Sequence, residues 1–315
     1  INESDAIIIC VPTPLRKSKD PDISYILSAL DEIATRDYFG KIIILESTTY
    51  PGTTVEVLQA RLEDKKHKTG KDFYLAFSPE RVDPGNKKYL IKNTPKIVGG
   101  VTEKCSNIAY TLYNYIVENV KIVTSPTVAE TVKLLENVFR SVNIGLINEM
   151  AMLCNRMNID IWEVIDGAST KPFGFMPFYP GPGLGGHCIP LDPFYLSWKA
   201  RSYDFNAKFI ELAGEINSNM PYYVINRISD CLNTIKRSIK NSKILVIGVS
   251  YKNDIDDIRE SPALDIIKLL LNKGAKISYY DPYVPELNIW NKKFKSIKFV
   301  NQNISKFDMV LIVIN

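Results

Sequence analysis

The residues with the clearest chemical potential lie in a loop rich in glycine and proline, residues 181–193. Four glycines precede Cys188, and Asp192 follows it four residues later. Glycines let a backbone approach a bulky ligand or adopt positive φ angles. A thiol with a carboxylate close behind it suits a cysteine nucleophile that has a base beside it. An isolated cysteine is more often a buried structural residue, but the loop context favours a nucleophile here.

A lysine and an asparagine form the second candidate group. Lys133 and Asn137 lie in a stretch, residues 129–157, whose apolar spacing predicts one or two helices. Side chains four residues apart share one helix face and can converge. From the spacing alone, an ordinary surface pair of a lysine and an asparagine is the expected interpretation. Only two histidines are present, so there are few candidates for the base of a Ser-His triad or for metal ligands. We therefore expect no metal.

Six sequence blocks, in the same order, resemble those of the UDP-glucose/UDP-mannose (nucleotide-sugar) 6-dehydrogenase family. The blocks are Val11-Pro12-Thr13-Pro14, Glu46-Ser47-Thr48 with Pro51-Gly52-Thr53, Ser78-Pro79-Glu80-Arg81, Ala129-Glu130 through Lys133 and Asn137, Gly185 through Cys188 to Pro193, and Gly248 through Arg259-Glu260-Ser261. They span nearly the whole chain. The resemblance implies an NAD-dependent enzyme that oxidises the C6 hydroxyl of a UDP sugar to the uronic acid, for surface polysaccharide biosynthesis.

The family's chemistry transfers two hydrides and must retain the aldehyde formed between them. A cysteine thiol does this through a thiohemiacetal and then a thioester, and the resemblance gives that role to Cys188. It also implies that Lys133 and Asn137 stabilise the oxyanions and that Asp192 and Glu80 act as bases. Thr48 is expected to position the attacking water or the nicotinamide.

The ligand contacts implied by the resemblance fall into two sets. The NAD contacts are Val11, Pro12, Thr13, Thr48, Glu80 and Arg259. The UDP-sugar contacts are Glu80, Arg81, Val82, Lys133, Asn137, Arg140, Tyr179, Gly181, Gly185 and Lys252. Arg259 and Lys252 suit a diphosphate, but acidic residues crowd the same loop, so ion pairing on the surface is an open alternative.

The amino-acid sequence of the catalytic loop resembles that of family members that act on N-acetylated amino sugars. The run from Tyr179 to Cys188 carries this resemblance, and its continuation from Ile189 to Leu196 fits enzymes for UDP-N-acetylglucosamine or its galacto isomer. The manno branch tends to have Ala at the place of Pro190. We therefore predict UDP-N-acetyl-D-glucosamine as the substrate. UDP-N-acetylgalactosamine, UDP-N-acetylmannosamine and UDP-glucose stay open, because epimers differ by one or two hydrogen bonds.

The elements that position these residues alternate strands with helices at both ends of the chain. Continuous apolar runs at 6–11, 41–45, 73–77, 96–98 and 120–123 predict a parallel sheet covered on both faces. We predict an α/β fold with two incomplete Rossmann-like domains, the NAD-binding part at 1–125 and the UDP-binding part at 241–315. A central helical domain at 126–240 joins them. Residues 290–304 are expected to be mostly connection.

The sequence begins with Ile and directly on a strand, which suggests a piece of a longer chain. The glycine-rich turn that contacts the NAD pyrophosphate is expected before Ala6 and is not in this sequence, so we expect weak NAD binding. Two alternatives stay open: a non-catalytic nucleotide-sugar-binding fragment, and a cysteine hydrolase or acyltransferase that would need a histidine base.

The composition of the chain limits which binding partners and which cellular compartment we expect. The 39 basic and 35 acidic residues are nearly balanced, and the basic runs are short and scattered, so we expect no nucleic acid. The longest apolar runs fall far short of the ~20 residues needed to span a membrane. Five cysteines without a C-x-x-C pair favour a reducing, cytoplasmic compartment. Helices expected at 205–239 are apolar on more than one face, which predicts a homodimer.

Overall fold

The computed structural model describes residues 1–16, 20–63, 65, 67–83, 86–186, 189–298 and 301–314. The chain forms two compact units. Unit 1 comprises Ile1–Val138 and Leu191–Ala207, and unit 2 comprises Phe139–Pro190 and Lys208–Asn315. The mixed α/β fold class is confirmed, whereas the division into three domains stays a prediction.

Unit 1 is built on a five-stranded sheet in the order β1-β2-β3-β4-β5. The strands are β1 (Ala6–Ile9), β2 (Ile42–Leu45), β3 (Tyr74–Phe77), β4 (Lys96–Gly100) and β5 (Val120–Ile122). β1, β2 and β3 run parallel, but β4 is antiparallel to β3, so the expectation of a wholly parallel sheet is wrong at this pair. Between β3 and β4 no helix is found among the described residues. The chain is therefore not carried back along the sheet, and β4 starts where β3 ends.

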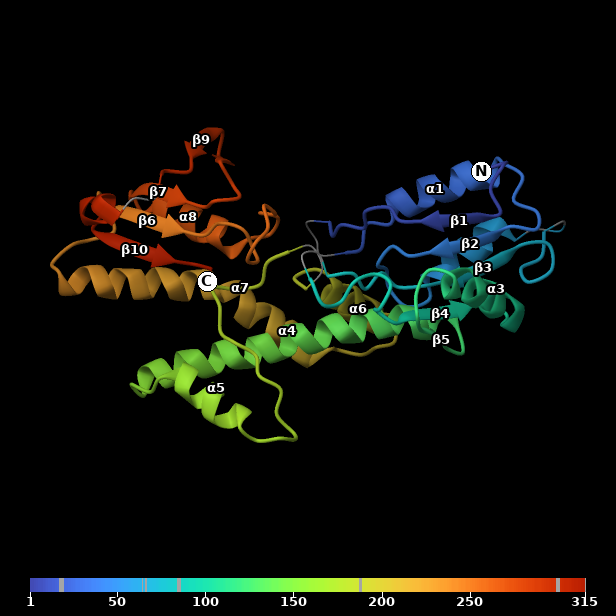
Figure 1. The fold of residues 1–315 in the computed structure, drawn as a ribbon, viewed down its shortest axis with the longest axis horizontal. Helices are drawn as coiled ribbons and strands as arrows, with labels where there is room; N and C mark the ends of the chain where they lie inside the picture. Colours follow the sequence, from blue (N-terminus) through green and yellow to red (C-terminus); the bar gives the residue numbers. More distant parts are fainter. Residues whose placement is uncertain are drawn as a thin grey trace. The chain divides into compact units, whose positions relative to one another are not determined.

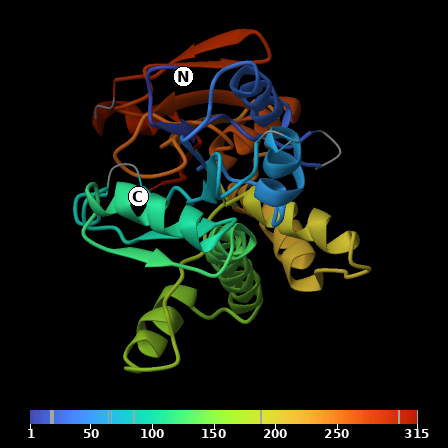
Figure 2. The same ribbon diagram turned by 90° about the vertical axis from the view of Figure 1, so that its right-hand side faces the viewer.

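Helices cover both faces of this sheet, as the continuous apolar strands predict. The helix α1 (Ser24–Ala34) and the short α2 (Ala60–Leu62), which follows a π-helical turn at Thr54–Gln59, lie on one face, and α3 (Glu103–Asn114) lies on the other (Figures 1 and 2). Successive strand residues point to opposite faces. Ile43 accordingly packs with Leu30 of α1, while Ile44 packs with Tyr113 of α3.

The helix α4 (Pro126–Arg156) contributes a buried carboxylate to unit 1. Glu130 is fully buried and accepts hydrogen bonds from the Gly52 amide at 2.5 Å, the Thr54 amide at 2.8 Å and the Thr54 hydroxyl at 2.6 Å. These donors belong to the first turn of the segment after β2, where amides have no partner within the helix. Gly52 has a φ of +100°, a conformation that a residue with a Cβ rarely adopts. Glu130 therefore fixes the Pro51-Gly52-Thr53 turn to α4.

Unit 2 contains a smaller parallel sheet in the order β10-β6-β7. Its elements are the remainder of α4, α5 (Ile161–Ser169), α7 (Lys208–Thr234), β6 (Lys243–Ile247), α8 (Pro262–Asn272), β7 (Lys276–Tyr280), β8 (Glu286–Ile289), β9 (Lys292–Lys295), a 3-10 turn at Asn301–Lys306 and β10 (Met309–Ile312). α7 continues through Pro221 as one helix. No helix of the described residues is long and apolar enough to cross a bilayer.

Two parts of the sequence reading need correction. Residues 290–304 are not mostly connection, because β9 pairs with β8 in an antiparallel hairpin. This hairpin was missed because β9 is almost wholly polar, and only Leu287 and Ile289 of β8 are buried. The last two residues of the expected non-helical loop, Asp192 and Pro193, start the helix α6 (Asp192–Arg201) in unit 1, since proline is tolerated in a first helical turn.

The contacts of Glu130 predict a stability effect. We expect Glu130→Ala to lower the free energy of unfolding by about 2 to 4 kcal/mol, because three donors lose their buried acceptor. Denaturant unfolding measures the loss, and amide exchange of residues 51–62 locates it. Glu149→Ala, an exposed glutamate of the same helix, is the matched control. An equal small effect of both variants would contradict the assignment.

Candidate functional site

The predicted oxyanion donors and one predicted base meet in unit 1. Asn137 of α4 donates from Nδ2 to Oδ2 of Asp192 at 2.5 Å, and both side chains are buried. The two helices are joined beside this contact by the packing of Leu134 of α4 against Tyr195 of α6. Lys133 lies one turn before Asn137 on α4, and its ammonium acts electrostatically on the Asp192 carboxylate. The sequence spacing therefore does bring these side chains together.

The environment of Asp192 changes its acidity. Burial raises the pKa of this carboxyl from 3.8 to about 7, although the Lys133 charge and the Asn137 hydrogen bond act to lower it. Desolvation disfavours the ionised form of a carboxyl group, and here it outweighs both partners. A carboxyl group with a pKa near neutrality can accept and return a proton at physiological pH.

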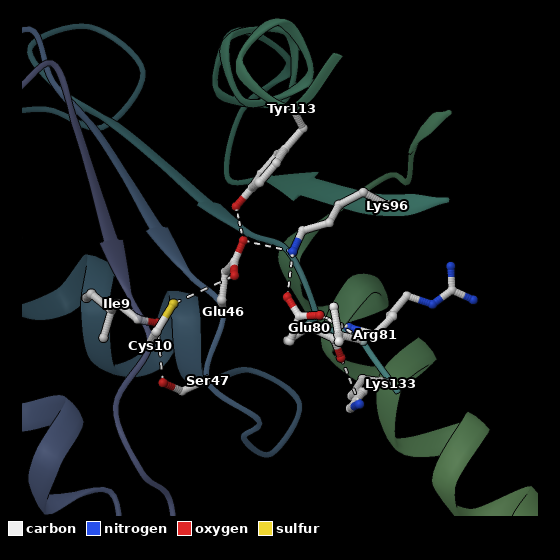
Figure 3. Close-up of polar contacts among 10 residues, drawn as sticks. Ile9, Cys10, Glu46, Ser47, Glu80, Arg81, Lys96, Tyr113 and Lys133 are labelled. Atoms are coloured by element: carbon white, nitrogen blue, oxygen red, sulfur yellow. Dashed lines mark hydrogen bonds and ion pairs between the residues drawn. The ribbon is translucent and has the colours of Figure 1, made fainter. Parts of the chain in front are cut away.

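A second cluster lies where β3 ends (Figure 3). Lys133 donates from Nζ to the backbone carbonyl of Glu80 at 2.8 Å. The Glu80 carboxylate accepts the amides of Arg81 and Val82 through Oε1, and its Oε2 lies 3.2 Å from Nζ of Lys96. Burial alone would raise the pKa of Glu80, but Lys96 and these two amides hold it below its usual value. Glu80 is thus an ionised acceptor next to Lys133.

Four of the predicted NAD contacts, Val11, Pro12, Thr13 and Thr48, lie at the carboxyl ends of β1 and β2. Ser47 fixes the loop after β1, because its hydroxyl donates to the carbonyl of Val11 and accepts from the amide of Val11, both at 2.8 Å. Tyr195 donates from its hydroxyl to the carbonyl of Thr13 at 2.6 Å, so the loop through Pro12 is fixed from a second side. Thr48, just beyond β2, is partly exposed. Ligands of open α/β sheets bind at such carboxyl ends.

Arg81 has contacts that the sequence did not suggest. Its guanidinium donates to the carbonyl of Pro95 and forms an ion pair with Glu136 of α4, both at 2.6 Å. These bonds join the segment after β3 to α4 and to the residue before β4. The structure therefore engages the predicted substrate contact in structural bonds, while the neighbouring Val82 is exposed.

In unit 2, a chain of buried amides fixes the glycine-rich loop. The Gly181 amide donates to Oδ1 of Asn148 at 2.9 Å, Asn148 donates to Oδ1 of Asn217 at 2.9 Å, and Asn217 donates to the carbonyl of Ser141 at 3.0 Å. Asn148 of α4 and Asn217 of α7 are both buried. Sequence reasoning missed them, since two polar residues within apolar helices were their only signal.

The same loop packs on the segment after β6. A Cβ on Gly185 would lie 2.5 Å from Cβ of Tyr251, and one on Gly186 would lie 2.8 Å from the Tyr251 ring, so both positions require glycine. The Gly186 amide donates to the carbonyl of Arg259 at 3.1 Å. The loop is therefore fixed up to Gly186 by close backbone approach.

The remaining predicted ligand contacts of unit 2 are all at least partly exposed. Tyr179 stacks on Trp162 with ring centroids 5.7 Å apart. Arg140 is exposed and Lys252 is partly exposed. The Arg259 guanidinium contacts both carboxylate oxygens of Asp257, which is the ion pairing left open as the alternative to diphosphate binding.

The predicted nucleophile Cys188 and its neighbour His187 lie outside the described residues. Cys10, directly after β1, is an exposed cysteine, but its surroundings disfavour the thiolate. Burial, followed by the charge of Glu46, raises the pKa of its thiol to about 11, and the thiolate is the reactive form.

The chain is similar in sequence to proteins of one known family along most of its length. Residues 1–117, 127–219 and 245–315 match the NAD binding domain, the central domain and the UDP binding domain of the UDP-glucose/GDP-mannose dehydrogenase family. A UDP-N-acetyl-D-mannosamine dehydrogenase of Campylobacter jejuni is 36% identical over 323 residues, which cover 99% of this chain and 77% of that protein. The chain belongs to this family.

Two further relatives belong to the same branch. A UDP-N-acetyl-D-mannosamine dehydrogenase of Methanococcus maripaludis is 41% identical over 286 residues. The match covers 89% of this chain but only 63% of the length of that relative. The solved structure of a UDP-D-ManNAc dehydrogenase from Pyrococcus horikoshii superposes with a TM-score of 0.88 at 34% identity, covering 99% of this chain and 72% of that one. The resemblance to the amino-sugar branch is thus confirmed.

The raised pKa of Asp192 predicts a pH dependence of stability. The folded carboxyl stays protonated up to pH about 7, while the unfolded one ionises near 3.8, so unfolding releases a proton between these values. Stability should therefore fall as pH rises from about 4 to 7, by up to about 4 kcal/mol at 1.36 kcal/mol per pH unit. Asp192→Asn should remove this contribution, as measured by denaturant unfolding across that range. Parallel curves for the parent and the variant would contradict the shift.

Proposed function

We propose that the full-length protein catalyses the NAD-dependent oxidation of the C6 hydroxyl of a UDP-N-acetylhexosamine to the uronic acid. The alcohol and one water lose four electrons as two hydrides and three protons, and the carboxylate remains. NAD, when bound, accepts each hydride. The observation that carries the proposal is the group of Lys133, Asn137 and Asp192, which places two donors beside a carboxyl group with a pKa near 7.

In this proposal each candidate catalytic side chain has a defined role in the reaction. Cys188 adds through its thiol to the aldehyde carbon, and the proton of the thiol passes to the new alkoxide. Loss of the second hydride from carbon, together with the proton of the thiohemiacetal hydroxyl, leaves a thioester. Water then cleaves the thioester to the carboxylate with release of a proton, and the thiol is restored. Lys133 and Asn137 stabilise the oxyanions as donors. Asp192 accepts the proton of the substrate hydroxyl or of the water, and Glu80 with Thr48 orients that water.

The residues at the carboxyl ends of β1 and β2 fit a nicotinamide cofactor. The backbone of Val11 and Thr13 is fixed by Ser47 and Tyr195, so this loop offers a rigid surface to a ligand. Lys252 and Arg259 stay our proposed diphosphate contacts, and Arg259 would share its guanidinium with Asp257. A reducing cytoplasm is the proposed location, since it would keep Cys188 as a thiol.

The epimer of the sugar is the finer part of the proposal. The sequence of the catalytic loop favoured UDP-N-acetyl-D-glucosamine as the substrate. The relatives reported above are, however, named for UDP-N-acetyl-D-mannosamine. These names support the manno epimer as the first candidate. NADH formation by the full-length protein with UDP sugars of gluco, galacto and manno configuration, with and without the acetamido group, would decide. UDP binding without turnover of any sugar would favour a non-catalytic nucleotide-sugar-binding protein.

The role of Cys188 as the nucleophile can be tested by substitution. We expect Cys188→Ser to retain the fold and to lower steady-state formation of the uronic acid by at least ~10²-fold, because a serine alkoxide is scarcely populated near neutral pH. Cys231→Ser, at an exposed cysteine of α7, is the matched control and should leave turnover unchanged. Turnover of Cys188→Ser within threefold of the parent would remove Cys188 from the mechanism.

A homodimer is the proposed assembly. Phe139, Leu146 and Leu153 follow one side of α4 at spacings of seven residues, and their exposed fractions are 46%, 53% and 47%. Met157, just after the helix ends at Arg156, is 58% exposed. On α7, Phe209 and Leu212 are exposed as well. Apolar side chains that repeat along one helix face indicate burial against another helix.

Light scattering of the full-length protein should give twice the mass of one chain. Leu146→Glu combined with Leu153→Glu should reduce it to one chain mass, because two charges would enter the apolar contact. Asn155→Glu places a charge on the opposite side of the same helix and serves as the control. A parent protein of single-chain mass at micromolar concentration would contradict the dimer.

A further inference from the structure

A lysine that no sequence block singled out lies between two carboxylates beside the predicted site. Lys96, the first residue of β4, forms ion pairs with Oε1 of Glu46 at 2.9 Å and with Oε2 of Glu80 at 3.2 Å (Figure 3). Its side chain is 12% exposed and that of Glu46 is 11% exposed, whereas that of Glu80 is 48% exposed. Of the three, only Glu80 is therefore accessible to a ligand.

The direction of β4 produces this contact. Phe77 of β3 is paired with Gly99 of β4, and continuing this antiparallel register brings Glu80 level with Lys96. In a parallel arrangement, the first residue of β4 would lie at the opposite end of the sheet. The antiparallel pairing of β4 with β3 thus brings a cation to the carboxyl ends of β1, β2 and β3.

Glu46 in turn fixes Lys96. The hydroxyl of Tyr113 in α3 donates to Oε1 of Glu46, and the Cys10 thiol donates to Oε2 at 3.7 Å. The Nζ of Lys96 also lies 5.0 Å from the centroid of the Tyr113 ring, where a cation is attracted by the π system. The ammonium is therefore held on its buried side before Glu80 is considered.

Among the described residues, the contacts of Glu80 leave it one acceptor position. A carboxylate has about four lone-pair sites, and the amides of Arg81 and Val82 with Lys96 occupy three. The remaining one is on Oε2. A carboxylate with this many fixed donors cannot rotate, so its last lone pair points in one direction.

We propose that Lys96 is a positioning residue: held by Glu46 and Tyr113, it orients the Glu80 carboxylate so that one lone pair of Oε2 faces the reacting groups. This inference rests on the proposed function, in which Glu80 orients water. Lys96 contacts the Glu80 carboxylate and Lys133 contacts its backbone carbonyl. Glu46 shares Lys96 with Glu80, and the charge of Glu80 acts on the Cys10 thiol. Removal of Lys96 would leave two carboxylates facing each other, and the exposed one, Glu80, would turn away.

Turnover by the full-length protein tests the proposal through a double-mutant cycle. Lys96→Met should lower kcat about tenfold or more with KM changed less than threefold, since an interaction of the transition state is lost. Lys96→Arg should restore most of this loss. With Glu80→Gln already present, Lys96→Met should have little further effect, because Lys96 acts through Glu80. Lys92→Met removes an exposed lysine four residues earlier and serves as the control.

Amide exchange tests the positioning independently of activity. Lys96→Met should speed exchange of the Arg81 and Val82 amides, which donate to Glu80, and Lys92→Met should not. Unchanged exchange, or kcat losses that multiply in the double variant, would overturn the proposal. If the parent forms no NADH with any UDP sugar, the proposed function fails and the catalytic part of this inference fails with it, while exchange still decides whether Lys96 positions Glu80.

Discussion

One side of helix α4 determines the arrangement of unit 1. Glu130, Lys133 and Asn137 follow each other at spacings of three and four residues, and each contacts a different segment. Glu130 accepts the amides after β2, Lys133 donates to the carbonyl of Glu80 after β3, and Asn137 donates to the carboxylate of Asp192 in α6. Because a helix is rigid, these three hydrogen bonds fix the segments relative to one another. The proposed catalytic groups are therefore placed by one helix rather than by flexible loops.

Burial raises the pKa of both candidate bases, but only in Asp192 does it outweigh the neighbouring groups. Asp192 is almost inaccessible, so desolvation outweighs its two partners and its pKa rises to about 7. Glu80 is half exposed and surrounded by Lys96 and two amides, so its pKa falls and it stays ionised. Two carboxyl groups with separated pKa values can have different roles: Asp192 can exchange protons, while Glu80 accepts a hydrogen bond. This division supports the roles proposed for them.

In unit 2, polar groups inside the helices serve the glycine-rich loop. Asn148 and Asn217 are buried where apolar residues would pack better, and a buried amide is costly unless its hydrogen bonds are made. Here they are made, and the last of them fixes the Gly181 amide. Gly185 and Gly186 then allow the loop to lie directly on Tyr251. The loop that leads to Cys188 is therefore supported by contacts spread over α4, α7 and the segment after β6.

The sequence by itself determined what depends on local order. Apolar runs gave the strands of the first sheet, helical spacing placed Lys133 and Asn137 on one face, and ordered motifs gave the family. The tertiary structure alone decided the direction of β4, and with it the pairing of Lys96 with Glu80. Strand direction depends on the path between strands, which apolar patterns do not record. The raised pKa of Asp192 was likewise hidden, because the acidity of a carboxyl group depends on the side chains that surround it, and residues far apart in the sequence supply them.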